Sequence, residues 1–329
     1  MVNSGRQLGY LKAISEGLVQ AMEKDKKIFL MGEGVDNIRG VYGVTLPAYK
    51  RFGSKRVIDT PLSENGLTGF AIGAAMDGLR PVLFHQRNDF MMLTMDQLVN
   101  QAAKINYISA GKHKVPLTIV SFVARKVGEG AQHSQSLQSL FAHVPGLKVI
   151  MPTTPYDAKG MLLSAISDDG PVIVLYHWIR IEGDVPLEVY EVPLGSSKIV
   201  RSGTDVTIVG ISAVVMDALA AAHELSIAGI DAEVIDLRSI RPLDERTILE
   251  SVKKTGRLAV VDTGWKNFGV SSEITALVAE KAFSFLKSPP CRIGMADTPA
   301  PAAPDLLKSY HPDREMIVAA IRQIMHLIE

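Results

Sequence analysis

The segment 59–76 places a carboxylate beside a glycine-rich helix start. Glu64 lies directly ahead of an apolar pattern with helical i, i+3 and i+4 spacing, whose members form an expected buried face. These members are Leu67, Phe70, Ala71, Ala74 and Ala75. The glycines Gly66, Gly69 and Gly73 favour a close approach of another backbone or of a ligand. An acid at this place either stabilises the positive end of the helix dipole or acts on a ligand, and the local pattern leaves both open.

Two other polar segments, 85–90 and 128–135, could act together with Glu64 because each of the three follows the end of an expected strand. Parallel sheets bind ligands at the carboxyl ends of their strands, where loops and helix N-termini converge. We therefore expect the three segments to meet at one edge of a sheet and to form a site there. The motifs for other common sites are missing: there is no Gly-x-Gly-x-x-Gly run after the first strand, no phosphate-binding loop, no Gly-x-Ser-x-Gly elbow and no His-x-Glu metal spacing.

The elements that must position these residues form two series of alternating strands and helices. The first series has expected strands at 28–31, 57–58, 81–84, 117–122, 147–151 and 172–176, with helices at 10–23, 67–77, 91–108, 135–142 and 157–167. The second has strands at 206–210, 232–237, 258–262 and 292–295, with helices at 213–228, 245–254, 271–286 and 313–328. Alternation of this kind predicts an α/β fold of two domains, each a mostly parallel sheet flanked by helices. The expected division is 1–185, a linker at 186–204, and 205–329.

Composition excludes several classes of protein. The chain has 329 residues and is 47% hydrophobic, enough for a large core. Its 35 Lys and Arg residues balance 35 Asp and Glu residues, so no net charge favours nucleic acid or an anionic membrane. The single cysteine, Cys291, excludes an internal disulfide and fits a reducing cytoplasm. No apolar run approaches the ~20 residues that span a bilayer, and residues 8–22 predict an amphipathic helix rather than a signal peptide.

Taken together, the blocks along the chain resemble one known family. They are Lys27–Gly34, Asp59–Gly66, Gly78–Pro81, Asp96–Lys104, Gly130–Ser136, Pro145–Val149, Thr154–Gly160, Ile235–Pro242, Phe268–Val270 and Asp297–Pro301. Their order and spacing resemble the β subunit of the thiamine-diphosphate-dependent decarboxylating component of 2-oxo-acid dehydrogenases, of the pyruvate, branched-chain or acetoin type, within the transketolase superfamily.

The resemblance implies a pyrimidine-binding domain followed by a transketolase C-terminal-like domain. It implies that a separate α subunit ligates Mg²⁺ and the diphosphate through a Gly-Asp-Gly…Asn-Asn motif, which this sequence lacks. The expected assembly is an α₂β₂ heterotetramer that acts with a lipoyl-bearing acyltransferase. The expected activity is decarboxylation of a 2-oxo acid and transfer of the acyl group to the lipoyl carrier.

Site residues follow from the same resemblance. Glu64 matches the acid that hydrogen-bonds the pyrimidine ring nitrogen of thiamine and favours the 4′-imino tautomer, the coenzyme's own base; an apolar surround would raise the pKa of this acid. Phe90 matches the aromatic residue stacked on the pyrimidine, and Leu67 is assigned to the same cofactor site. His133 matches a histidine of the active-site channel, suited to proton or acyl transfer. Structural roles for Phe90 and His133 remain open alternatives.

A potassium site is a further implication of the resemblance. The matching positions are Leu117, Ala165, Ile166 and Asp168, whose oxygens suit a hard cation. The alternative is that Asp168 caps a turn in the Ser-Asp-Asp-Gly sequence.

Segment 84–90 departs from the family, where this run is largely apolar and aromatic. Here His85, Gln86 and Arg87 bring polar groups, and Arg125 and Lys126 add two cations before the His133 segment. One interpretation is a solvated loop or an ion pair to the α chain; the other is an anionic or polyhydroxylated substrate contacted by His85 and Arg87. Two alternatives to the dehydrogenase follow: a split transketolase-like or acyloin-forming enzyme, and a non-catalytic partner subunit.

Overall fold

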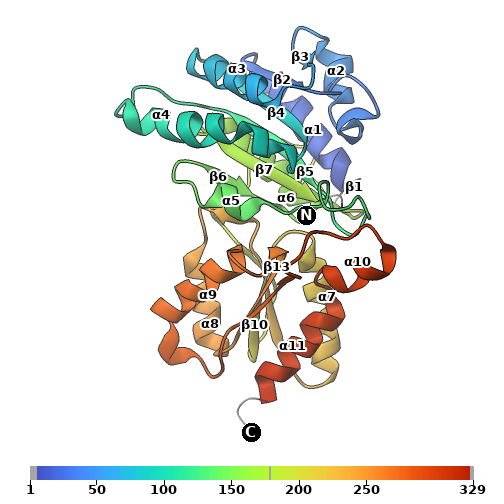
Figure 1. The fold of residues 1–329 in the computed structure, drawn as a ribbon, viewed down its shortest axis with the longest axis vertical. Helices are drawn as coiled ribbons and strands as arrows, with labels where there is room; N and C mark the ends of the chain where they lie inside the picture. Colours follow the sequence, from blue (N-terminus) through green and yellow to red (C-terminus); the bar gives the residue numbers. More distant parts are fainter. Residues whose placement is uncertain (1–5, 178, 327–329) are drawn as a thin grey trace. The chain divides into compact units, whose positions relative to one another are not determined.

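A computed structural model describes residues 6–177 and 179–326 of the chain (Figure 1). The chain divides into two compact units, which are described separately. The first unit comprises Met1–Val123 and Leu140–Leu194, and the second comprises Ala124–Ser139 and Gly195–Glu329.

The first unit is built on a parallel sheet with strand order β6-β7-β5-β4-β2-β3. Its strands are β2 (Ile28–Gly32), β3 (Val57–Asp59), β4 (Arg80–Arg87), β5 (Thr118–Val123), β6 (Lys148–Ile150) and β7 (Val172–His177). Every residue of β2, β5 and β7 is buried, as expected for strands covered on both faces. A short antiparallel pair, β1 (Gln7–Gly9) and β8 (Glu182–Asp184), lies in the same unit.

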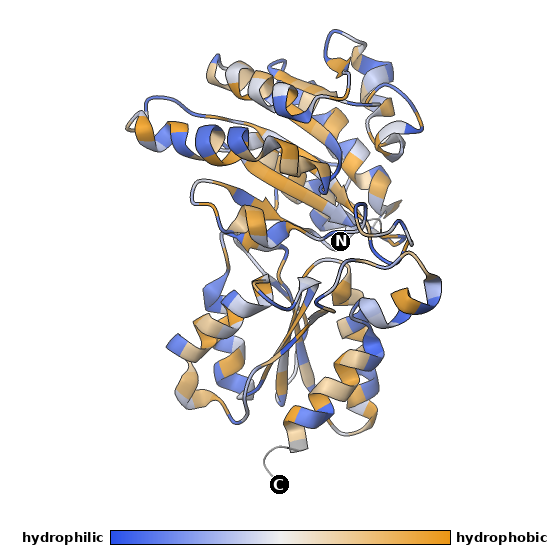
Figure 2. Cartoon of the chain, in the orientation of Figure 1, coloured by the Kyte–Doolittle hydropathy of each residue, from blue (hydrophilic) through white to orange (hydrophobic). Residues whose placement is uncertain are grey.

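Helices cover this sheet. They are α1 (Tyr10–Lys24), η1 (Gly40–Gly43), α2 (Leu46–Phe52), α3 (Glu64–Met76), η2 (Phe90–Thr94), η3 (Gln97–Ala102), α4 (Ala103–Ile108) and α6 (Pro155–Ser167), with α5 (Gln138–Ala142) at the junction of the two units. Figure 2 shows the central strands coloured as hydrophobic, whereas the helices carry both kinds of residue. Tyr10, Phe122 and Tyr176 pack edge-on or tilted in the core, with ring centroids 5.7 and 6.0 Å apart for the two pairs with Tyr176.

The second unit has a sheet with strand order β14-β13-β10-β11-β9, in which β9 alone is antiparallel to its neighbour. Its elements are β9 (Lys198–Arg201), β10 (Val206–Gly210), α7 (Val214–Ile227), β11 (Ala232–Asp236), β12 (Ser239–Arg241), α8 (Glu245–Thr255), β13 (Leu258–Trp265), α9 (Val270–Lys281), η4 (Phe283–Phe285), β14 (Cys291–Met295), α10 (Pro304–Tyr310) and α11 (Arg314–His326). None of the helices in the described ranges is both long and apolar enough to cross a membrane.

The predicted fold class is confirmed, with several local differences. The single helix expected at 91–108 is three consecutive pieces, one of them a π-helical turn. Part of the expected linker is strand β9, and helices α2 and α10 were not predicted. Residues 327 and 328 of the last expected helix lie outside the described residues. The boundaries 1–185, 186–204 and 205–329 stay a prediction.

Candidate active site

Helix α3 presents Glu64 as its first residue, after the turn that follows β3. The helix starts there without a side-chain cap from Ser63, and the first backbone bond runs from Leu67 N to Ser63 O at 2.9 Å. Glu64 is half-buried. A carboxylate in the first turn is stabilised by the positive end of the helix dipole.

The predicted buried face of α3 is confirmed for Ala71 and Ala75 and wrong for Phe70. The helix buries Thr68, Ala71, Ile72 and Ala75, whereas Phe70 is 60% exposed and Leu67 half-buried. The expected close approach is not made at Gly73, where a Cβ would meet no atom of the described chain within 4 Å. The helix therefore turns a glycine-containing apolar face away from its own unit.

The strand connections reverse direction between β2 and β4. From β2 the chain continues to β3 at one edge of the sheet, and from β4 it continues to β5 in the opposite direction. Ligands of open α/β sheets bind outside the carboxyl ends of the strands at such a reversal. The ends of β2 and β4 are linked there, since Gln86 Nε2 donates to Glu33 O at 3.3 Å. The end of β2 is also linked to β3, since Gly34 N donates to Asp59 Oδ1 at 2.6 Å.

Phe90 opens η2 directly after β4 and is 37% exposed. Segment η2 packs against α3, so Phe90, Glu64 and Leu67 belong to neighbouring elements of the first unit. The structure thus brings the β3 and β4 connections together, as the sequence predicts. The coenzyme-binding roles of these three residues stay predictions.

His85 has a different environment from the expected one. Its side chain lies in the interior at 4% exposure, with Nε2 3.1 Å from Thr68 Oγ1 of α3. Burial lowers the pKa of His85 to about 4, so the ring is neutral at physiological pH. The ring is held under α3 and does not present a donor at the exposed edge. Arg87, at the end of β4, is half-buried beyond a bulge in the pairing with β5, and its contact with a substrate stays a prediction.

His133 belongs to the second unit, on a segment held by a buried polar cluster. Gln138 Nε2 donates to Asp262 Oδ1 at 2.8 Å, and Gly264 N donates to the same oxygen at 2.9 Å. Burial raises the pKa of Asp262, and these hydrogen bonds oppose that shift. His133 is half-buried, with its backbone N 3.3 Å from Gly130 O. Asp262 and Gln138 were not identified from the sequence.

Of the two cations before the His133 segment, the Arg125 side chain is engaged within the second unit, and Lys126 makes a contact there through its backbone. Arg125 pairs with Asp217 at 2.7 Å and donates to Pro312 O at 2.7 Å. The backbone N of Lys126 contacts His311 Nε2 at 3.3 Å. Burial, together with the nearby Arg125 and Lys126, lowers the pKa of His311 to about 4. The ion pair to Asp217 favours a structural role for Arg125.

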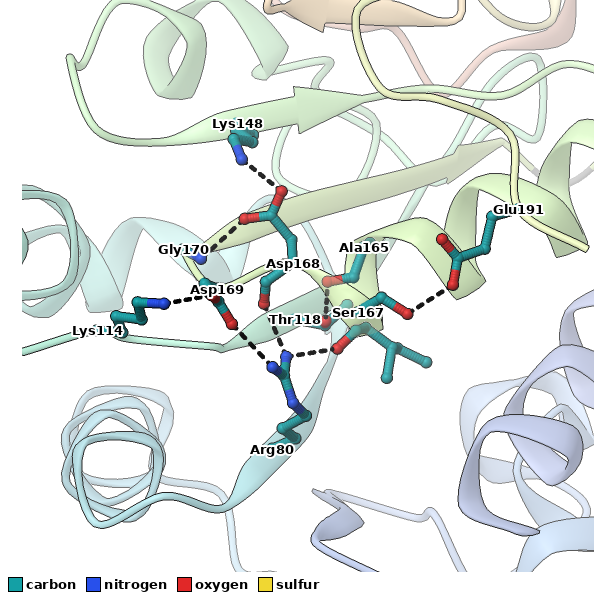
Figure 3. Close-up of polar contacts among 11 residues, drawn as sticks. Arg80, Lys114, Thr118, Lys148, Ala165, Ser167, Asp168, Asp169, Gly170 and Glu191 are labelled. Carbon is teal, nitrogen blue, oxygen red and sulfur yellow. Dashed lines mark hydrogen bonds and ion pairs between the residues drawn. The ribbon is translucent and has the colours of Figure 1, made fainter. Parts of the chain in front are cut away.

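Of the residues expected at the potassium site, Ala165 and Ile166 lie in the last turn of helix α6 and Asp168 begins the turn to β7; Figure 3 labels Ala165 and Asp168. Arg80 Nη1 donates to Ile166 O at 3.0 Å and to Asp168 O at 2.9 Å. The Asp168 carboxylate accepts Gly170 N at 2.8 Å and pairs with Lys148.

The remaining two oxygens of that set are also hydrogen-bonded: Ala165 O accepts Thr118 Oγ1 at 3.1 Å, and Leu117 O accepts Val172 N at 2.9 Å. The guanidinium of Arg80 supplies a fixed positive charge among the carbonyls that would ligate the ion. These contacts favour the alternative that Asp168 caps the turn, and the potassium site stays a prediction.

Comparisons with known proteins identify the family. Residues 6–181 match the transketolase pyrimidine binding domain, and residues 195–317 match the transketolase C-terminal domain. The chain is 43% identical to the acetoin:2,6-dichlorophenolindophenol oxidoreductase β subunit of Cupriavidus necator, over 97% of this chain and 98% of that relative. It is 42% identical to the mitochondrial pyruvate dehydrogenase E1 component β subunit of Rattus norvegicus, over 98% of this chain and 91% of that relative.

The chain belongs to the family of E1 β subunits of 2-oxo-acid dehydrogenases. The predicted family is therefore confirmed. A solved structure, a split-gene transketolase described as an inactive β4 tetramer, matches with a TM-score of 0.81 over 98% of this chain and 99% of that chain. Its sequence identity is 21%, so this likeness shows the shared fold of an E1 β subunit and a transketolase chain.

Proposed function

We propose that this E1 β subunit binds the pyrimidine half of thiamine diphosphate and, with an α subunit, decarboxylates a 2-oxo acid and passes the acyl group to a lipoyl carrier. The observation that carries the proposal is the position of Glu64, the first residue of α3, on the connection that follows β3 and in a helix that packs against η2, which follows β4. The family match over both domains supports the same cofactor.

The role of Glu64 follows from its chemistry. Thiamine diphosphate, when bound, supplies the electron sink for cleavage of the bond next to a 2-oxo group. Glu64 would hold a proton at the pyrimidine ring nitrogen, which sets the tautomer of the ring, while Phe90 and Leu67 would pack against it. His133 would transfer a proton near the substrate.

A partner chain is supported by the exposed apolar surface of the first unit. Large apolar side chains are exposed on α3 and η2; they are Phe70, Met76, Phe90, Met92 and Leu93. Contiguous apolar exposure of this kind is typical of an interface. We infer that an α subunit covers this surface in an α₂β₂ assembly and brings Mg²⁺ and the diphosphate contacts, since this sequence lacks the corresponding motif.

A second candidate activity is cleavage of acetoin with transfer of the two-carbon unit. It is favoured by relatives named as acetoin oxidoreductase β subunits, at 43% and 41% identity. A polar donor substrate would also suit the half-buried Arg87.

The cytoplasmic location expected from the lone, half-buried Cys291 stays a prediction.

The test is co-expression with an α subunit of the same family, followed by an assay with dichlorophenolindophenol as electron acceptor. Pyruvate, branched-chain 2-oxo acids, acetoin and ketose phosphates are compared with and without a lipoyl domain. We expect dye reduction with a 2-oxo acid and acylation of the lipoyl domain. Turnover of acetoin alone supports the second candidate. Turnover only of ketose phosphates, or tight thiamine diphosphate binding by this chain alone, contradicts the proposal.

A further inference from the structure

We propose that His85 is a positioning residue that holds the first turn of α3, and thereby the carboxylate of Glu64, through the hydroxyl of Thr68. This inference rests on the proposed role of Glu64. It assigns a function to a residue that departs from the aromatic, apolar run expected at this place in the family.

The hydrogen-bond directions define the chain of contacts. Thr68 Oγ1 donates its single hydrogen to Glu64 O at 2.8 Å. The hydroxyl can therefore only accept from His85 Nε2, 3.1 Å away, which fixes the hydrogen of the ring on Nε2. His85 thus donates to Thr68, and Thr68 donates to the carbonyl of Glu64, one turn earlier on α3.

Burial makes this contact specific. Thr68 is fully buried and His85 is 4% exposed, so water cannot replace either partner. A threonine that bonds the carbonyl four residues back is common in helices by itself. Here the oxygen of Thr68 is also fixed from the sheet, because it accepts from the ring of His85, a residue of β4. A separate bond, from Ser121 Oγ of β5 to His85 O at 2.7 Å, does not involve the ring. The start of α3 is thus hydrogen-bonded through side chains to the strand that ends beside Phe90.

The low pKa of the ring agrees with this role. Burial keeps His85 neutral at physiological pH, and a neutral ring with hydrogen on Nε2 donates one bond without placing a charge under the helix. A ring that donates through Nε2 to Thr68 does not offer that nitrogen to a substrate.

The experiment compares His85→Gln, which can donate from a similar position, with His85→Met, which cannot, in the reconstituted αβ complex. The readout is proton–deuterium exchange at the reactive carbon of thiamine diphosphate, together with coenzyme affinity. We expect His85→Met to slow this exchange by about three- to tenfold with little change in coenzyme affinity. This factor corresponds to the loss of one hydrogen bond. His85→Gln should recover most of the rate.

Three controls separate the outcomes. Ser121→Ala removes the neighbouring bond to the backbone of His85 and should leave the exchange rate unchanged; a drop equal to that of His85→Met would show general loosening and overturn the inference. Thr68→Val combined with His85→Met should be no slower than the slower single variant, and additive losses would also overturn it. Glu64→Gln is measured alongside. A normal exchange rate in Glu64→Gln refutes the proposed function. A slow rate in Glu64→Gln together with a normal rate in His85→Met refutes only the positioning role of His85.

Discussion

Replacing Lys159 by methionine should strongly destabilise the first unit. The Lys159 side chain is fully buried on α6, and its Nζ lies 2.8 Å from Glu16 Oε1 of α1. The same nitrogen contacts Pro186 O at 2.7 Å and Glu188 O at 3.0 Å. One ammonium group thus joins two helices to the segment that follows β8.

The magnitude follows from what methionine leaves behind. Breaking a buried ion pair by removing one partner costs about 3–5 kcal/mol because the other charge stays desolvated. Glu16 keeps its bond to Arg6 at 2.7 Å and its side chain is 20% exposed, which moves the expected loss toward the lower end, about 3 kcal/mol.

The assay is urea denaturation of purified protein, comparing Lys159→Met with Lys12→Met, a matched substitution at an exposed position of α1. We expect a loss of about 3 kcal/mol in the free energy of unfolding for the first variant and within ~0.5 kcal/mol of wild type for the control. A loss below ~1 kcal/mol for Lys159→Met would refute the reasoning, because it would mean that the buried contacts contribute no more than a surface pair.

Three further predictions concern pH, cations and the His133 segment. Burial raises the pKa of Glu16, but hydrogen bonds from Arg6 and Lys159 outweigh burial and leave that pKa below its usual 4.5. The stabilisation by ionised Glu16 is therefore present above pH ~4.5 and lost as pH falls further, so the stability gap between wild type and Glu16→Gln should close in acid. A gap that widens in acid contradicts the pairing. Because Arg80 donates to two of the oxygens expected to ligate potassium, replacing KCl with choline chloride at constant ionic strength should leave the melting temperature unchanged, and a clear rise specific to potassium would contradict this. Gln138→Leu should lower the free energy of unfolding of the second unit by about 2 kcal/mol, because it removes a hydrogen bond to the buried Asp262. Calorimetry measures this loss against Ser139→Ala, and equal melting temperatures of the two variants would contradict a stabilising role for the Gln138–Asp262 bond.

The alternating pattern was sufficient to predict the fold class and the position of Glu64. Short apolar runs identify buried parallel strands, and the turn after β3 puts the acid at a helix start. Helices α2 and α10 were missed because each is seven residues long with a proline in its first turn, a composition typical of loops as well.

Other features could not be read from one sequence. The face of α3 was assigned wrongly at Phe70 because apolar residues lie on more than one side of the helix, and periodicity cannot distinguish a face buried by its own chain from one covered by a partner. The pairing of Thr68 with His85 joins a helix to a strand 17 positions away, and that of Gln138 with Asp262 joins positions 124 apart. Such contacts follow from tertiary packing, which local spacing does not encode.

The central claim is that Glu64 activates the coenzyme, and Glu64→Gln tests it most directly. Glutamine keeps the shape and a hydrogen bond to the pyrimidine but cannot share a proton with the ring nitrogen. In the reconstituted complex, NMR of proton–deuterium exchange at the reactive carbon of thiamine diphosphate isolates this step, with coenzyme affinity as the control. The account predicts a fall of ~10²–10⁴ in the exchange rate with at most a modest loss of affinity. Exchange as fast as in the wild type would mean that Glu64 is only a carboxylate at a helix start.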